Sequence, residues 1–188
     1  MDPTDEDLIA ASAAGDRDAF GALYRRRRPD VYRFALHMTG SRAAAEDIVQ
    51  DVFLAIMRDA HRYRAGSSGF VPWLLGIARN HARRHAAKRA MGALDEVDER
   101  GLEPDDPVAR DEELARLRAG LAALPSRYRE AVVLCDLEEL PYAEAAKVIG
   151  CALGTVRSRL HRGRARLAVH MKRASRNVAG ARIPKWIL

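Results

Sequence analysis

The sequence predicts an all-α protein with two small helical domains joined by a flexible acidic linker, the C-terminal domain being a helix-turn-helix. Apolar residues recur at helical spacing through most of the chain, with no convincing strand alternation. The 188 residues suffice for one domain or two small ones, and 48% are hydrophobic, enough for a buried core. Glycine, proline and a run of acidic residues interrupt the helical pattern between residues 92 and 110. The predicted division is 1–94, 95–113, 114–171 and a basic tail, 172–188.

Five helices are expected in the first domain. Proline fits the first turn of a helix, so Pro29 is expected to begin one, and Gly40 is expected to end it. Ser41 can cap the next helix by accepting a hydrogen bond from one of its free N–H groups. A Gly/Ser loop, residues 66–69, precedes the last helix of this domain. The expected ranges are 5–14, 18–24, 29–39, 43–61 and 70–90.

The second domain is expected to contain the helix-turn-helix. A short helix at 141–149 follows Pro141 and stops at Gly150, and a four-residue turn leads to a helix at 154–170 with Thr155 as its N-cap. Small polar and arginine side chains on the outer faces of that last helix suit the major groove of DNA. A basic surface helix without a DNA partner is the alternative. Two further helices are expected at 112–123 and 125–137, and the inward face of the last helix is Val156, Leu160, Gly163 and Leu167.

Charge is distributed in blocks that the formal net charge of +6 conceals. Residues 61–94 hold seven basic and no acidic residues, and residues 145–188 hold eleven and none. The predicted linker, 95–113, holds ten acidic and two basic residues. Solvated helix faces usually mix both signs, so blocks this uniform favour two surfaces for a polyanion.

Several classes of protein are excluded by what the sequence lacks. The acidic N-terminus is not that of a secretory signal, and the longest apolar run, 70–78, is too short to cross a bilayer. Cys135 and Cys151 form neither a CxxC pair nor a disulfide framework. His81 and His85 have metal-ligand spacing but lack the glutamate of a metalloprotease helix, so packing is the preferred interpretation. We therefore expect a cytoplasmic protein that is not an enzyme and uses no metal, cofactor or small-molecule substrate.

The helix expected at 43–61 has one broad apolar half and one polar half. The polar half presents a leucine among two aspartates and a glutamine, which suits a protein-docking face or, equally, a solvated face with one stray leucine. The polar face is Asp47, Gln50, Asp51 and Leu54, and the apolar half is Ile48, Val49, Val52, Phe53, Ile56 and Met57.

Basic and aromatic residues alternate around the start of the helix at 70–90. Such residues can bind a nucleic-acid strand and stack an unpaired base. The alternative is that Phe70 and Trp73 are core residues, which is preferred for Trp73, while Tyr63 stays open. Arg79 and Arg83 are expected to project from the side of the helix opposite to Trp73.

Four motifs in this order give the chain a resemblance to a known family. They are EDIVQDVF at 46–53, FVPWLLGIARN at 70–80, LPSRYREAVVL at 124–134 and GTVRSRLHRGR at 154–164. The set resembles bacterial RNA polymerase sigma factors of the sigma-70 family, in particular the extracytoplasmic-function (ECF) group. The resemblance runs from about residue 5 to 170.

The resemblance implies a role for each surface. Asp47, Gln50, Asp51 and Leu54 would bind the clamp coiled coil of the β′ subunit of core RNA polymerase. The residues implied for the minus-ten element of promoter DNA are Arg62, Tyr63, Arg64, Arg79, Asn80 and Arg83. Those implied for the minus-thirty-five element are Thr155, Arg157, Ser158, Arg159, His161 and Arg162.

The family also implies partners beyond these surfaces. The chain would contact the β subunit as well as β′, and its acidic linker would follow a basic path through the polymerase. An anti-sigma factor is expected to control it and could tether it at the membrane, without membrane insertion of the chain itself. The competing reading is a self-sufficient helix-turn-helix repressor or activator, which would bind its DNA tightly without core polymerase.

Overall fold

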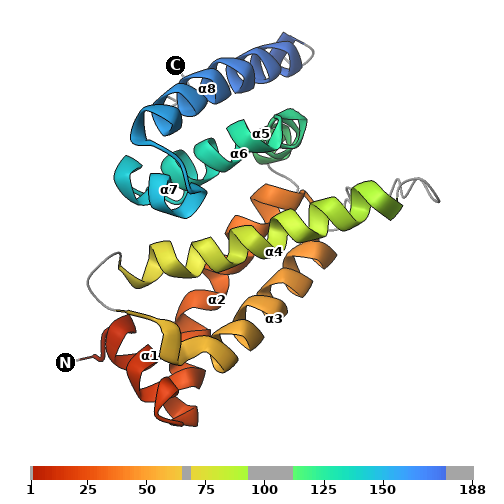
Figure 1. Ribbon diagram of the computed structural model, residues 1–188. Coiled ribbons are helices and arrows are strands. Elements are labelled where there is room, and N and C mark those ends of the chain that lie inside the picture. The colour runs from red at the N-terminus through yellow and green to blue at the C-terminus, as the bar shows by residue number, and fades with distance from the viewer. Residues whose placement is uncertain (1, 65–68, 93–111, 177–188) are drawn as a thin grey trace.

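The computed structural model describes residues 2–64, 69–92 and 112–176, and all regular structure within these ranges is helical. Figure 1 shows two groups of helices stacked on each other, with the C-terminal group above α4. The prediction of an all-α protein with two helical domains is confirmed. Most of the predicted linker and residues 177–188 of the predicted tail lie outside the described residues. The expected path of the linker through the polymerase therefore stays a prediction.

The N-terminal domain packs three helices and one short turn around α2. These elements are α1 (Asp5–Ala13), α2 (Arg17–Thr39), α3 (Arg42–Asp59), the 3-10 turn η1 (Ala60–Arg62) and α4 (Phe70–Gly92). Helix α2 contacts α1, α3 and α4. Its Leu23 and Phe34 are fully buried with Ile56 of α3 and Leu74 of α4. Removing this apolar area from water is the main force that holds the four helices together.

Pro29 lies inside a helix and does not begin one, so that prediction was wrong. Helix α2 runs unbroken from Arg17 to Thr39, although a proline in a helix interior removes one backbone hydrogen bond. Leu23 before the proline and Val31 after it are both fully buried in the same core. Tertiary packing on both sides therefore outweighs the local cost.

The ends of α2 and α3 confirm two local predictions. Gly40 ends α2 with a positive φ of 71°, and its N–H donates to the Leu36 carbonyl at 2.8 Å. Ser41 caps α3, because its side-chain oxygen accepts a hydrogen bond from the Ala44 N–H at 3.3 Å.

The C-terminal domain consists of α5 (Glu112–Ala123), α6 (Ser126–Val132), the π-helical turn η3 (Val133–Leu137), α7 (Tyr142–Ile149) and α8 (Leu153–Arg176). Helices α7 and α8 form the predicted helix-turn-helix, with Gly150 at a φ of 73° after α7. Val156, Leu160, Gly163 and Leu167 are all buried, as predicted.

Two details of α8 differ from the prediction. The helix begins at Leu153, so Thr155 is not its N-cap; the Thr155 N–H already donates to the Ala152 carbonyl at 2.9 Å. It also continues to Arg176, six residues beyond the expected end. Met171 is 1% exposed, and this burial extends the packed face of α8 past residue 170.

The two domains contact each other through polar groups. Arg33 Nη2 lies 2.8 Å from Glu138 Oε2, and Arg79 Nη2 lies 3.0 Å from Glu130 Oε2. Arg129 Nη1 also donates to the Met38 carbonyl at 2.6 Å. These contacts join α2 and α4 of the first domain to the second.

Candidate nucleic-acid and polymerase interfaces

The outer face of α3 is exposed and carries the predicted docking residues. Asp47, Gln50 and Asp51 are exposed, and the Leu54 side chain is 53% exposed. Met57, which was expected on the buried half of the helix, is 61% exposed, so that part of the prediction was wrong. An apolar groove of about 510 Å³ runs beside this face and is lined by Phe20, Tyr24, Arg28, Glu46, Val49, Gln50, Phe53, Leu54 and Met57.

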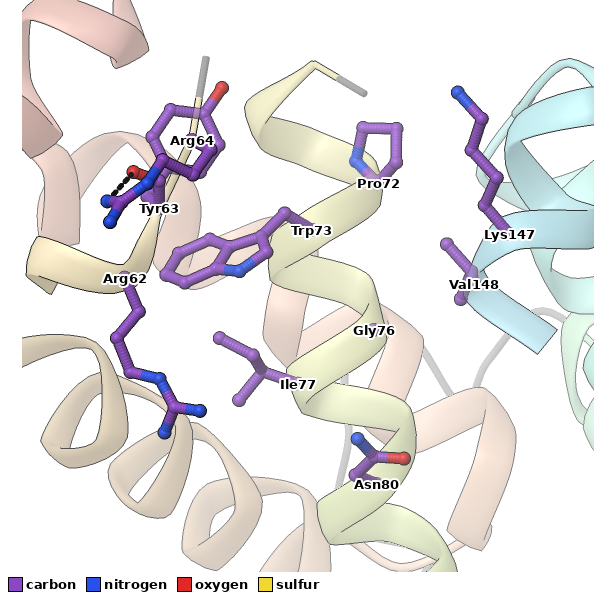
Figure 2. A pocket seen from close by; sticks show the side chains of 10 residues that line it. All are labelled: Arg62, Tyr63, Arg64, Pro72, Trp73, Gly76, Ile77, Asn80, Lys147 and Val148. Carbon is purple, nitrogen blue, oxygen red and sulfur yellow. Dashed lines mark hydrogen bonds between the residues drawn. The ribbon is translucent and has the colours of Figure 1, made fainter. Parts of the chain in front are cut away.

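A second hollow lies between η1 with the residues that follow it, α4 and α7, and has a volume of about 450 Å³. Figure 2 shows the Trp73 ring between Tyr63 and Arg62 on one side and α4 on the other. The Trp73 and Tyr63 ring centroids are 5.2 Å apart, and Phe70 is 5.7 Å from both. The residues that line the hollow are Arg62, Tyr63, Arg64, Pro72, Trp73, Gly76, Ile77, Asn80, Lys147 and Val148.

This hollow brings together four of the six residues predicted for the minus-ten element. They are Arg62, Tyr63, Arg64 and Asn80. Phe70 is 2% exposed and belongs to the core, whereas Trp73 is half-buried and faces the hollow. Aromatic faces beside guanidinium groups can stack an unpaired base and attract its phosphates.

Tyr63 is in contact with helix α1. Its hydroxyl donates a hydrogen bond to Glu6 Oε1 at 3.4 Å. Partial burial, together with the nearby Glu6 carboxylate, raises the pKa of the Tyr63 hydroxyl above its ordinary value. A tyrosine with its ordinary pKa is already neutral at pH 7, so the ring is uncharged and suited to stacking.

Arg79 is not on the open surface where the sequence predicted it. Its side chain is 9% exposed, and its guanidinium bonds Glu130 at 3.0 Å and the Val148 carbonyl at 3.3 Å. Arg83, one helical turn away, is exposed, with its Nε 3.9 Å from the Glu130 carboxylate. Helices α6 and α7 thus lie over this part of α4, and nothing in the sequence of α4 indicated that contact.

The start of α8 presents the residues predicted for the minus-thirty-five element. Arg157, Ser158, His161 and Arg162 are exposed, and Thr155 and Arg159 are half-buried. The Ser158 hydroxyl donates to the Thr155 carbonyl at 3.0 Å, and Arg159 Nη1 lies 4.0 Å from Cys151 Sγ. An exposed row of this kind can lie in the major groove, with arginines reaching base edges or phosphates.

Two arginines farther along α8 have structural partners. Arg164 Nε donates to Asp136 Oδ2 at 3.1 Å, which fixes α8 against η3. The Arg166 guanidinium lies 5.3 Å from the centre of the Tyr128 ring. Neither belongs to the residues implied for the minus-thirty-five element, and their contacts hold the domain together.

The sequence candidates for metal or thiol chemistry can be located in the described part of the chain. No group of three His, Cys, Asp or Glu side chains in it could hold a metal ion. Cys135 and Cys151 are free and half-buried, and burial raises the pKa of the Cys135 thiol to about 11. His81 is one of the two histidines with metal-ligand spacing, and its Nδ1 lies 3.3 Å from Asp51 Oδ2. No helix among the described residues is long and apolar enough to span a bilayer.

Comparison with known proteins assigns a family to both domains. Residues 23–92 match "Sigma-70 region 2" and residues 114–167 match "Sigma-70, region 4". The chain is 36% identical over 95% of its length to ECF RNA polymerase sigma factor SigE of Mycolicibacterium smegmatis, 74% of which is covered. It is 34% identical over 88% of its length to ECF RNA polymerase sigma factor SigM of Mycobacterium tuberculosis, 83% of which is covered.

Two solved structures have the same arrangement of helices. CnrH, in complex with the cytosolic domain of CnrY, superposes with a TM-score of 0.70 at 28% identity, over 90% of this chain and 97% of that one. The sigma factor RpoE of Bartonella quintana, in complex with the anti-sigma factor NepR, also gives 0.70 at 28% identity, over 81% and 96%. The chain therefore belongs to the ECF group of the sigma-70 family of RNA polymerase sigma factors.

Proposed function

We propose that this chain binds core RNA polymerase as a dissociable specificity subunit and directs transcription initiation at promoters. One observation carries the proposal: the two matched regions occur in the order region 2, region 4, and each coincides with an exposed surface of the matching chemistry. The predicted domains, 1–94 and 114–171, then divide the work, with the acidic linker passing between them through the polymerase.

The first domain binds the polymerase and opens DNA. The α3 face of Asp47, Gln50, Asp51 and Leu54 docks on the β′ clamp coiled coil, and other parts of the chain contact the β subunit. A base of the minus-ten element enters the hollow beside Tyr63 and Trp73. Unpairing a base costs a few kcal/mol, which stacking on the aromatic rings and contacts with Arg62, Arg64, Asn80 and Arg83 offset. Arg79 joins them once it is free of Glu130.

The second domain reads duplex DNA upstream. The exposed start of α8 enters the major groove at the minus-thirty-five element, where Ser158, His161 and Arg162 face the bases. Arg157 and Arg159 flank this row and suit phosphates, which position the helix without reading sequence. Thr155 lies at the beginning of the same row.

Regulation and location follow from the family. Two relatives of known structure are bound to CnrY or to the anti-sigma factor NepR, which supports control of this chain by an anti-sigma factor. The chain acts in the cytoplasm with the polymerase, reaches the membrane only through such a partner, and catalyses no reaction of its own.

Runoff transcription tests the proposal. Purified chain is added to core RNA polymerase on a library of genomic fragments, and the transcripts are sequenced. Discrete start sites that need both the chain and the core enzyme are expected, with a shared upstream sequence. Tight, sequence-specific binding of duplex DNA by the chain alone, without any core-dependent transcript, would contradict it and favour a self-sufficient regulator.

A further inference from the structure

Glu6 contacts both sides of the segment that leads into α4. Its Oε1 accepts hydrogen bonds from the Tyr63 hydroxyl at 3.4 Å and from the Phe70 backbone N–H at 3.2 Å. Phe70 is the first residue of α4, where backbone N–H groups have no partner within the helix and a negative charge is favoured. One carboxylate therefore ties the start of α4 to the ring that lines the hollow.

The neighbouring residue fixes the helix that carries Glu6. Asp5 is 8% exposed and accepts hydrogen bonds from Arg27 Nε at 2.8 Å and Arg26 Nη1 at 3.2 Å. These bonds anchor α1 on α2, so Glu6 extends from a rigid support. Helix α1 precedes the matched region, 23–92, and no motif in the sequence marked Glu6.

We propose that Glu6 is a positioning residue for promoter opening, which holds Tyr63 and the start of α4 in the arrangement that accepts an unpaired base. The inference rests on the proposed function, because it assigns the hollow to the minus-ten strand. Glu6 acts through Tyr63 and Phe70 and does not itself touch DNA.

The test uses one promoter in two forms, fully duplex and with the minus-ten segment already unpaired. Glu6→Ala removes the acceptor of both hydrogen bonds, so runoff transcription from the duplex should fall several-fold while the unpaired template keeps most of its activity. Glu6→Gln retains the oxygen and should restore most of the duplex activity. Asp2→Ala, at an exposed acidic residue of the same terminus, is the matched control and should match the unchanged chain.

Two results would overturn this role for Glu6. One is wild-type activity of Glu6→Ala on the duplex, and the other is an equal loss on both templates, which would indicate a purely structural residue. Absence of transcription with the unchanged chain would instead contradict the proposed function.

Discussion

His81 Nδ1 of α4 lies 3.3 Å from Asp51 Oδ2 of α3. The two residues belong to different proposed surfaces, Asp51 to the polymerase face and His81 to the helix beside the DNA hollow. A pocket of about 690 Å³ continues from one to the other and includes Leu54, Trp73 and Asn80 in its lining. The two proposed surfaces therefore adjoin on one small domain, and docking of the polymerase on α3 would act directly on α4.

Leu54→Ala should weaken core polymerase binding at least tenfold without unfolding the chain. Leu54 is 53% exposed, so its truncation leaves no cavity, and docking of the polymerase on this face would remove its apolar surface from water. Affinity for core enzyme can be measured by anisotropy of a labelled chain. Met91→Ala, at a 77% exposed position near the end of α4, is the control. Equal affinities for the two variants would contradict the docking face.

Arg162→Ala should reduce transcription from a duplex promoter and relax the preference at one base of the minus-thirty-five element. A lost arginine–base contact costs about 1–3 kcal/mol, whereas a lost phosphate contact weakens all sequences alike. Transcription from promoters randomised at that element distinguishes the two. Lys172→Ala, at an exposed residue beyond the matched region 4, is the comparison. An unaltered base preference with weaker overall activity would reassign Arg162 to the phosphates.

Local sequence patterns correctly predicted part of the structure. The inward face of α8 and the Ser41 cap follow from helical periodicity and cap chemistry, and both are confirmed. The prediction that Pro29 begins a helix was wrong because local sequence rules do not report tertiary packing on both sides of a proline. The burial of Arg79 and the roles of Glu6 and Glu130 depend on residues 51 to 64 positions apart, which no local pattern reports.

The close approach of α6 and α8 predicts opposite effects for two glycines of one helix. A Cβ at Gly163 would lie 2.7 Å from Val132 Cγ2 and 3.2 Å from the Tyr128 carbonyl oxygen, whereas a Cβ at Gly154 meets nothing within 4 Å. Gly163→Ala should therefore lower the free energy of unfolding by about 1–3 kcal/mol through overpacking. Gly154→Ala should raise it by up to about 1 kcal/mol through helix propensity. Urea denaturation measures both, and a stabilised Gly163→Ala would contradict the packing.

Acid should destabilise the chain through His37. Burial, with Arg118 and Arg33 nearby, lowers the pKa of His37 from 6.5 to about 4, and its Nδ1 is buried without a hydrogen-bond partner among the described residues. The folded state therefore keeps His37 neutral while the unfolded chain protonates it. Stability from this residue is fully present above pH 6.5 and is lost as the pH falls toward 4.

The loss is at most about 3 kcal/mol, because each unit of pKa difference corresponds to about 1.4 kcal/mol. Urea denaturation of the unchanged chain and of His37→Gln at a series of pH values from neutral to mildly acidic isolates this contribution. Glu138, whose pKa burial raises, acts with the opposite sign in the acidic part of this range, but it is common to both proteins and cancels in their difference. The stability difference between the two proteins should shrink as the pH falls. A difference that stays constant with pH would show that His37 titrates normally and that its surroundings are open to water.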